Sequence, residues 1–182
     1  MSMKRINPAT ISFEEIPITV HYLEQPSPTP SVVTLPENVS AVLWSTPRDV
    51  HEYRSLYYSV GEKWNWLDRI FMEDEALNEA INNDQTSIYL FQYLGETIGY
   101  IELVDLTDAV EIQYFGLFPE HTGKGWGPAL LNWVINKAAG YGKPKIQLNT
   151  CSLDHPKALQ VYKKAGFVEI KQEFPIRKRR IN

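Results

Sequence analysis

Three glycines within five residues mark the part of the sequence best suited to bind an anion. They form the segment Gly123-Lys124-Gly125-Trp126-Gly127, which lies between a predicted strand and a predicted helix. Alternating glycines let the backbone turn sharply and approach a ligand closely. The free N–H groups of the first helical turn then point to one place, where the helix dipole adds positive potential. The segment therefore predicts a binding site for a phosphate or a similar anion.

The spacing of these glycines does not match two common phosphate-binding motifs. A Walker A loop has the pattern G-x-x-x-x-G-K-[ST], and a dinucleotide fingerprint has G-x-G-x-x-G in a parallel βαβ unit. Here the third glycine comes one residue early, and the strands before it are predicted to be antiparallel. The segment alone is also compatible with a tight turn that binds nothing.

The hydrophobic pattern around this loop indicates a mixed α/β (α+β) fold. Period-two runs at 87–94 and 100–106, joined by a turn with Gly95 and Gly99, predict a hairpin, and 110–117 predicts a third strand. Helical spacing covers 49–60 and 64–81, and a further helix begins at Gly127 and ends at Gly140. The remaining predicted elements are strands at 40–45, 145–150 and 167–170 and a helix at 156–165.

The first 38 residues have a different composition from the rest. Pro26, Pro28 and Pro30 fall within a short stretch, and proline at this density disfavours helix and central strand alike. Only 19–23 has the pattern of a short strand. We therefore expect residues 1–38 to be an N-terminal extension, in part a linker, and residues 39–182 to form one domain.

Composition limits the class of protein. The chain has 182 residues, 43% hydrophobic and 22% charged, as is usual for a soluble globular protein. Its net charge of −4 argues against a nucleic-acid partner, and its single cysteine, Cys151, excludes an intrachain disulfide. It has no signal-peptide pattern and no apolar run of about 20 residues. We expect a soluble cytoplasmic protein without a membrane partner. The histidines lack metal-ligand spacing, which predicts no metal.

Two segments together resemble the GNAT superfamily of N-acetyltransferases. EIQYFGLFPEHTGKGWGPALL contains an apolar-x-Pro step at 117–119 before the glycine loop, and HPKALQVYKKAGF contains the spacing of Ala158 and Tyr162 and the step Gly166-Phe167. The resemblance covers roughly 39–170. It implies a central, mostly antiparallel mixed sheet with a V-shaped splay and helices on both faces. It also implies acetyl-CoA as acyl donor and an amine as acceptor.

The resemblance implies that the loop N–H groups bind the pyrophosphate of coenzyme A. Thr122 stands where the family usually has Arg or Gln, and His155 stands where it has Asn. The N–H of Leu117 or Phe118 would bind the thioester oxygen as this gains charge. The residues expected to bind the cofactor are Leu117, Phe118, Thr122, Gly123, Lys124, Gly125, Trp126, Gly127, Asn149 and His155.

Two residues are expected to be catalytic because they match family positions. An alkyl amine has a pKa of about 10.4, so a proton acceptor is useful near neutral pH, and Glu111 matches the family's general base. The departing thiolate needs a proton, and Tyr162 matches the family's acid. The alternatives are a salt-bridged strand glutamate and a packed core tyrosine. Asp154 and His155 are expected to be a helix cap, and Cys151 a small buried residue.

The acceptor site is expected on the first helices and central strands. Trp64, Trp66 and Tyr114 are the predicted substrate-binding residues. Acids at 68 and 73–75 either favour a cationic amine or form a solvated helix face. The basic run 177–180 either binds a phosphate of coenzyme A or RNA, or is solvated.

Three functions are compatible with the sequence. The first is direct transfer of acetyl from acetyl-CoA to a primary amine of a small molecule or protein. The second is a non-catalytic coenzyme-A-binding module of the same fold. The third is an interaction protein that uses the proline-rich start or the basic end. The sequence leaves open the acceptor, the acyl chain length and the oligomeric state, a homodimer included.

Overall fold

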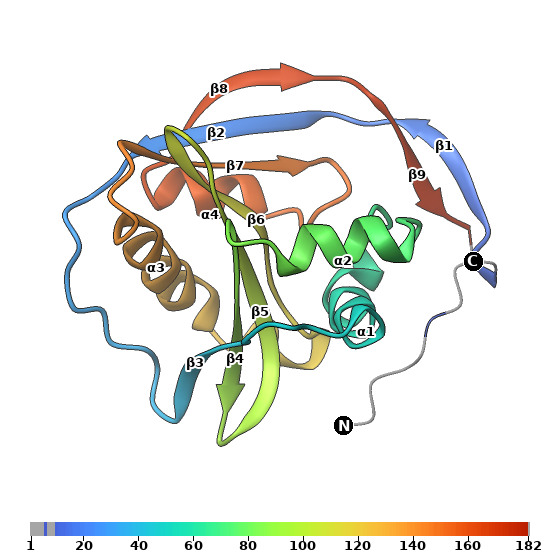
Figure 1. The fold of residues 1–182 in the computed structure, drawn as a ribbon. Coiled ribbons are helices and arrows are strands. Elements are labelled where there is room, and N and C mark those ends of the chain that lie inside the picture. The colour runs from blue at the N-terminus through green and yellow to red at the C-terminus, as the bar shows by residue number, and fades with distance from the viewer. Residues whose placement is uncertain (1–5, 7–9, 182) are drawn as a thin grey trace.

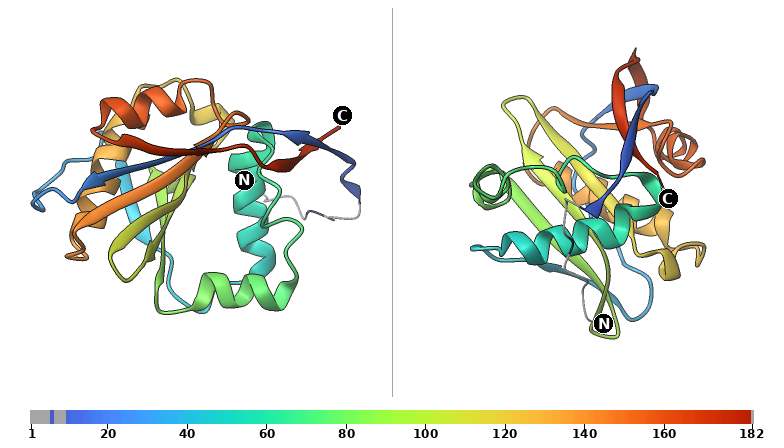
Figure 2. Two further views of the ribbon diagram at one scale, coloured as in Figure 1. Left: turned by 90° about the horizontal axis from the view of Figure 1, so that it is seen from above. Right: turned by 90° about the vertical axis from the view of Figure 1, so that its right-hand side faces the viewer.

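The computed structural model describes residue 6 and residues 10–181. In this part of the chain, a seven-stranded sheet carries helices on both faces, and a two-stranded arm extends from it (Figures 1 and 2). The strands are β1 (Phe13–Pro17), β2 (Val20–Pro26), β3 (Val39–Leu43), β4 (Thr86–Tyr93), β5 (Glu96–Asp105), β6 (Ala109–Leu117), β7 (Lys145–Cys151), β8 (Val168–Glu173) and β9 (Ile176–Arg180). The helices are α1 (Val50–Gly61), α2 (Asp74–Asn82), α3 (Trp126–Ala139) and α4 (Ala158–Lys164), with 3-10 turns η2 (Glu62–Trp64) and η3 (Pro119–His121).

The sheet has the strand order β3-β4-β5-β6-β7-β2-β8. All neighbours are antiparallel except β6 and β7, which are parallel. These two strands pair only where residues 109–112 face residues 145–148, although both strands continue further. Beyond Ile112 and Leu148 they separate, which confirms the predicted mixed sheet with a V-shaped splay.

A β-bulge lies where the splay begins. On β5, Leu103 faces Ile112 and Glu102 faces Tyr114, so Gln113 is an extra residue on β6. A bulge bends its strand and changes which side the following side chains face. Ile112 and Phe115 therefore both pack in the core that contains α3, whereas Tyr114 packs in the core that contains α1.

Each face of the sheet has its own hydrophobic core. One lies under α3 and α4, and the other lies under α1 and α2 (Figure 1). In α1 the residues Tyr53, Leu56, Tyr57 and Val60 recur on one side and are at most 2% exposed. Burying such side chains stabilises the fold by about 1.5–3 kcal/mol each. No helix among the described residues has the length and apolar character needed to cross a membrane.

The segment before residue 39 contributes a strand to the main sheet. β2 lies between β7 and β8, and its Leu23 is 1% exposed. Residues 27–38, which contain two of the three prolines, form the connection to β3. A domain boundary at residue 38 stays a prediction. The main sheet crosses this position, because β2 is an inner strand between two strands that follow residue 38.

The basic C-terminal run forms a strand of its own. β9 pairs with β1 in antiparallel fashion, and the two form the arm seen in Figure 2. Arg179 pairs with Glu14 of β1, and Arg180 pairs with Glu62 and with the hydroxyl of Tyr58. Carboxylates of the same chain therefore neutralise part of this run.

The contact between β2 and β8 gives a pH-dependent prediction. Glu169 accepts hydrogen bonds from His21 (2.8 Å), Lys163 (2.6 Å) and Gln172 (2.5 Å), which together hold its pKa at about 2. A carboxyl whose pKa is lower in the folded state stabilises above its unfolded pKa and loses this effect as the pH falls. We expect Glu169→Gln to lower the melting temperature at pH 7, with a difference from wild type that shrinks between about pH 4.5 and 2. The control Glu15→Gln, at an exposed position of β1, should show no such convergence.

Candidate functional site

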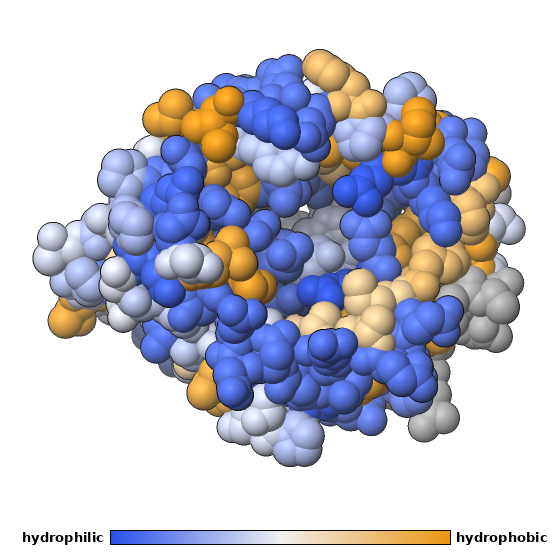
Figure 3. Space-filling view, turned by 45° about the horizontal axis from the view of Figure 1, so that its top comes forward, coloured by the Kyte–Doolittle hydropathy of each residue, from blue (hydrophilic) through white to orange (hydrophobic). Residues whose placement is uncertain are grey.

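A cavity of about 610 Å³ opens where β6 and β7 separate. Its walls come from β6, β7, the start of α3, α4, the residues around η2, and β9, and a hollow is visible at the centre of Figure 3. Most of the predicted site residues line this one space. They are Trp64, Trp66, Tyr114, Leu117, Thr122, Gly123, Gly125, Trp126, Gly127, Asn149, His155 and Tyr162. Glu111, Phe118 and Lys124 do not line it.

The glycine loop has the geometry of an anion-binding helix start. Gly123 and Gly125 have φ angles of 76° and 80°, in the left-handed region that favours glycine. Gly125 is the N-cap of α3, so no side chain caps the N–H groups at the start of this helix. A Cβ atom placed on Gly123, Gly125 or Gly127 would meet no atom within 4 Å, so space is open in front of the loop. The loop can therefore present its N–H groups to a phosphate.

The two polar side chains of this loop are engaged locally. The hydroxyl of Thr122 donates to the carbonyl of Pro119 at 2.7 Å. Lys124 Nζ lies 3.2 Å from Nδ1 of His121 and 5.2 Å from the ring centre of Trp126. Lys124, which we expected at the cofactor, thus packs on its own loop outside the cavity wall. The backbone N–H groups and the dipole of α3 are therefore what this loop offers to an anion in the cavity.

The end of β6 contains the two residues expected to donate to the thioester oxygen. Leu117 lines the cavity. The N–H of Phe118 instead donates to the carbonyl of Ile98 at 2.8 Å, and its ring is buried in the core under α1. The expectation for Phe118 is therefore corrected, because its donor is already paired within the sheet.

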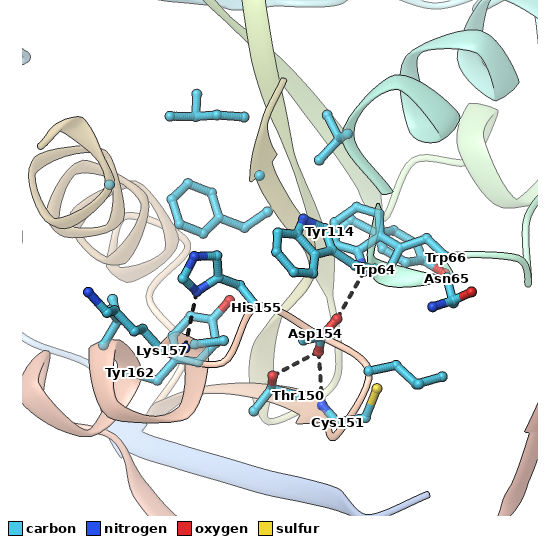
Figure 4. A pocket seen from close by; sticks show the side chains of 18 of the residues that line it. Trp64, Asn65, Trp66, Tyr114, Thr150, Cys151, Asp154, His155, Lys157 and Tyr162 are labelled. Carbon is cyan, nitrogen blue, oxygen red and sulfur yellow. Dashed lines mark hydrogen bonds between the residues drawn. The ribbon is translucent and has the colours of Figure 1, made fainter. Parts of the chain in front are cut away.

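Tyr162 reaches the cavity from the first turns of α4. Its ring packs edge-on against Phe167, with 6.1 Å between ring centres. In Figure 4 the hydroxyl points into the cavity, close to Asp154 and His155. Burial, together with the negative charge of Asp154, raises the pKa of Tyr162 well above its ordinary value. The phenol is therefore a proton donor throughout the neutral range.

The loop between β7 and α4 is tied to the other side of the cavity. Asp154 accepts hydrogen bonds from Trp66 Nε1 (3.0 Å), Thr150 Oγ1 (2.8 Å) and the Cys151 N–H (2.8 Å), as Figure 4 shows. The ring of Trp64 lies 5.0 Å from that of His155. His155 Nδ1 also accepts the N–H of Lys157. Lys157 is the N-cap of α4 and the helix has no side-chain cap, so neither Asp154 nor His155 caps it as the sequence suggested.

An aromatic wall faces this loop. The rings of Tyr57 and Tyr114 are 5.0 Å apart, those of Trp66 and Tyr114 are 5.2 Å apart, and those of Tyr57 and Trp66 are 5.5 Å apart. Such rings provide a large contact area with few rotatable bonds. Cys151 lines the same space, and burial together with Asp154 raises its pKa to about 11, which keeps it a thiol. The expectation that it is not a nucleophile agrees with this environment.

A buried ion pair supports the aromatic wall from behind. Glu102 is 0% exposed and accepts hydrogen bonds from the hydroxyl of Tyr53 (2.5 Å) and from Arg69 (2.8 Å). The guanidinium of Arg69 lies 5.5 Å from the ring centre of Tyr114. Burial raises the pKa of Glu102, and the charge of Arg69 opposes that rise. The sequence did not indicate this pair, because Glu102 has the ordinary period-two spacing of a strand residue.

Comparison with known proteins identifies the family. Residues 48–167 match the sequence profile of the acetyltransferase (GNAT) family, which is more than half of the chain. The chain belongs to the GNAT family. Acetyltransferases of this family use acetyl-CoA as their acyl donor.

Several solved GNAT structures share the fold at low sequence identity. A GCN5-related N-acetyltransferase from Sphaerobacter thermophilus has a TM-score of 0.61 and 16% identity, over 92% of this chain and 53% of that one. A GNAT acetyltransferase from Elizabethkingia anophelis with acetyl-CoA bound has a TM-score of 0.52 and 19% identity, over 71% of this chain and 76% of that one. The ribosomal-protein-S18-alanine N-acetyltransferase from Escherichia coli has a TM-score of 0.57 and 15% identity, over 73% of this chain and 79% of that one. The chain spans about half of the Sphaerobacter protein.

In this GNAT protein, Glu111 lies at the narrow end of the splay. Its carboxylate is 3.4 Å from Nε2 of Gln147 on β7, and burial raises its pKa above the ordinary value. A raised pKa suits a base that works near neutral pH. Glu111 does not line the cavity, however.

Both signs of charge lie around the aromatic wall of this GNAT protein. Of the acids at 68 and 73–75, only Asp68 lines the cavity. Asp74 instead pairs with Arg54 at the start of α2. Arg177 and Lys178 of β9 line the cavity as well. This side of the cavity therefore carries both signs of charge, and of the two alternatives for these acids an acidic mouth is not the one that the lining favours.

The open space at Gly127 gives a prediction for ligand binding. Gly127 lies in the first turn of α3 with an ordinary helical backbone, so Gly127→Ala should stabilise the free protein by about 0.5–1 kcal/mol. Its methyl group would occupy the space in front of the loop, so we expect the affinity for acetyl-CoA to fall. Thermal melting without ligand and calorimetric titration with acetyl-CoA measure the two effects. A variant that is more stable and binds equally well would show that no ligand touches this turn.

Proposed function

We propose that this GNAT protein transfers acetyl from acetyl-CoA directly to a primary amine of a small molecule or a protein. The observation that carries the proposal is the single cavity in which the glycine loop, Tyr162 and the aromatic wall meet. The residues fit the donor, since the space before Gly123, Gly125 and Gly127 is open and the start of α3 has no side-chain cap. The loop N–H groups would bind the pyrophosphate.

The proposed roles of the residues follow from charge and protonation. The amine nitrogen bonds to the acyl carbon as the carbon–sulfur bond breaks, so the nitrogen loses a proton and the sulfur gains one. Tyr162 holds a proton at neutral pH and would supply it to the sulfur. The N–H of Leu117 would stabilise the charge that develops on the acyl oxygen. Glu111 would take the amine proton through water.

A non-catalytic coenzyme-A-binding module is the second candidate. Two observations favour it. The hydroxyl of Thr122 donates to the carbonyl of Pro119 and so is engaged within the loop, and Glu111 does not line the cavity. Such a module would bind acetyl-CoA without consuming it. Ligand binding and turnover therefore have to be measured separately.

Two measurements test these candidates in sequence. Acetyl-CoA should raise the melting temperature, because a ligand at 100 times its Kd stabilises the native state by about 2.7 kcal/mol. Release of free thiol in the presence of a panel of primary amines would then demonstrate transfer. Binding without thiol release for any amine would favour the non-catalytic module. No shift at millimolar acetyl-CoA would reject both candidates.

We infer that the protein works in the cytoplasm, without a nucleic-acid or membrane partner. The net charge of −4 and the single cysteine, which cannot form an intrachain disulfide, support this setting. The proposed catalytic domain, residues 39–182, uses β2 from the preceding segment to complete its sheet.

A further inference from the structure

The acceptor side of the cavity contains a guanidinium from the C-terminal strand. Arg177 of β9 lines the cavity together with Asp68 and the aromatic wall. β9 is fixed in this place because the N–H of Arg180 donates to Asn65 at 3.0 Å and its side chain pairs with Glu62. The position of Arg177 is therefore built into the fold.

Arg177 is the least neutralised arginine of β9. Among the described residues its ion-pair partner is Asp68, at 3.5 Å, and the two side chains are 49% and 62% exposed. An exposed pair of this kind is weak. Arg179, in contrast, makes two contacts with Glu14, and Arg180 contacts both Tyr58 and Glu62. A guanidinium has five N–H donors, so Arg177 keeps donors that can face a ligand.

Lys178 also lines the cavity, but its ammonium group lies over two phenylalanine rings. Its Nζ atom lies 4.4 Å from the ring centres of both Phe13 and Phe71. Cation–π contacts of this kind satisfy an ammonium group without a counter-ion. Arg177 is thus the cation of β9 best placed to bind an anion in the cavity.

The cavity therefore has two anion-binding ends. The glycine loop and the start of α3 form one, and Arg177 forms the other. Arg177 lies close enough to the end of β7 for its charge to lower the pKa of Cys151, against the larger effect of burial. Tyr162, Asp154 and the aromatic wall line the space as well. If the loop holds the acyl donor, an anion at Arg177 belongs to the acceptor.

We propose that the acceptor carries an anionic group, a carboxylate or a phosphate, in the same molecule as its primary amine, and that Arg177 binds this group. Arg177 suits either anion because its planar fork can make two parallel hydrogen bonds to the oxygens. The aromatic wall would cover the apolar part of the acceptor. This inference rests on the proposed acetyl transfer.

Matched amines test the inference. Thiol release from acetyl-CoA would be measured with phenylalanine and phenethylamine, lysine and cadaverine, and O-phosphoethanolamine and ethanolamine. Rates are compared at equal concentrations of free amine, because an acid group changes the pKa of its amine. We expect kcat/KM to be about 10- to 100-fold higher for the acidic member of at least one pair, as for charge-assisted hydrogen bonds. The first two pairs test a carboxylate, and the third tests a phosphate.

Variants of β9 separate a specific contact from general effects. Arg177→Ala should reduce the preference within a pair to about threefold or less, with Arg177→Lys intermediate, since lysine keeps the charge but loses the fork. Arg179→Ala, on the same strand and paired with Glu14, should keep the wild-type preference. Melting temperatures check that each variant folds, and binding of acetyl-CoA should be unchanged in all three.

Several results would overturn the inference. One is a wild-type enzyme for which no acidic amine reacts faster than its partner without the acid group. Others are a preference that survives in Arg177→Ala, and a loss of acetyl-CoA affinity in that variant, which would place Arg177 at the donor. Failure of acetyl-CoA to raise the melting temperature is a different outcome, because it would reject the proposed function itself.

Discussion

Replacing Tyr162 by phenylalanine is expected to lower kcat about 100-fold or more, because general acid catalysis contributes about 10²–10⁴ to a rate. The hydroxyl faces the cavity, and burial beside Asp154 raises its pKa, so it holds the proton that a departing thiolate needs. The phenylalanine ring would keep the packing against Phe167. Binding of acetyl-CoA should therefore change little.

Single-turnover thiol release and calorimetric titration separate these two effects. Tyr141→Phe is a suitable control, because burial also raises the pKa of this hydroxyl and Tyr141 does not line the cavity. The control should retain wild-type kcat. Equal rates for wild type and Tyr162→Phe would leave Tyr162 as a packing residue, the alternative that its sequence position also allows.

Replacing Glu102 by alanine is expected to lower the free energy of unfolding by about 3–5 kcal/mol, as for other broken buried ion pairs. The substitution leaves Arg69, which is 8% exposed, without its carboxylate. It also removes the acceptor of the Tyr53 hydroxyl. The desolvation of an unpaired charge dominates this loss, because the alanine cavity alone would have a smaller effect.

Denaturant titration of three variants tests this explanation. Glu96→Ala, at the exposed start of β5, should change stability by no more than about 0.5 kcal/mol. The triple variant Glu102→Leu, Arg69→Met and Tyr53→Phe should recover most of the loss, since apolar side chains of similar size replace a buried ion pair well and no hydroxyl is left without its acceptor. A triple variant as unstable as Glu102→Ala would show that packing at this site, and not the unpaired charge, decides stability.

The elements with a strong local pattern were predictable from the sequence. The hairpin β4–β5, the strand β6 and the apolar side of α3 follow from period two and period 3.6. Their observed ends lie close to the expected ones, except that β5 begins at Glu96, inside the stretch expected to be the turn. The helical stretch expected over 64–81, with a loop at its start, is shorter, because Asn65, the residue after η2, has a left-handed conformation and α2 begins only at Asp74. β9 was not predicted, because its basic sequence forms a strand only by pairing with β1.

The site, too, has parts that follow from a local sequence pattern and parts that arise only from tertiary packing. The glycine loop and Tyr162 belong to contiguous motifs, so their spacing made them visible. The bond between Trp66 and Asp154 joins residues 88 positions apart, and Arg69 and Glu102 are 33 apart. Such contacts, like the placement of Arg177 beside Asp68, depend on tertiary packing that no local pattern encodes.

The position of β2 has a consequence for how the chain reaches its native state. β2 is synthesised well before its two neighbours, β7 and β8, and the contact of His21 with Glu169 spans 148 positions. On a ribosome this strand would stay unpaired until β7 and β8 have emerged. Contacts of such long range slow folding, and an unpaired strand exposes backbone groups to other chains. The seven-stranded sheet is therefore completed only when β2 pairs with the strands made long after it.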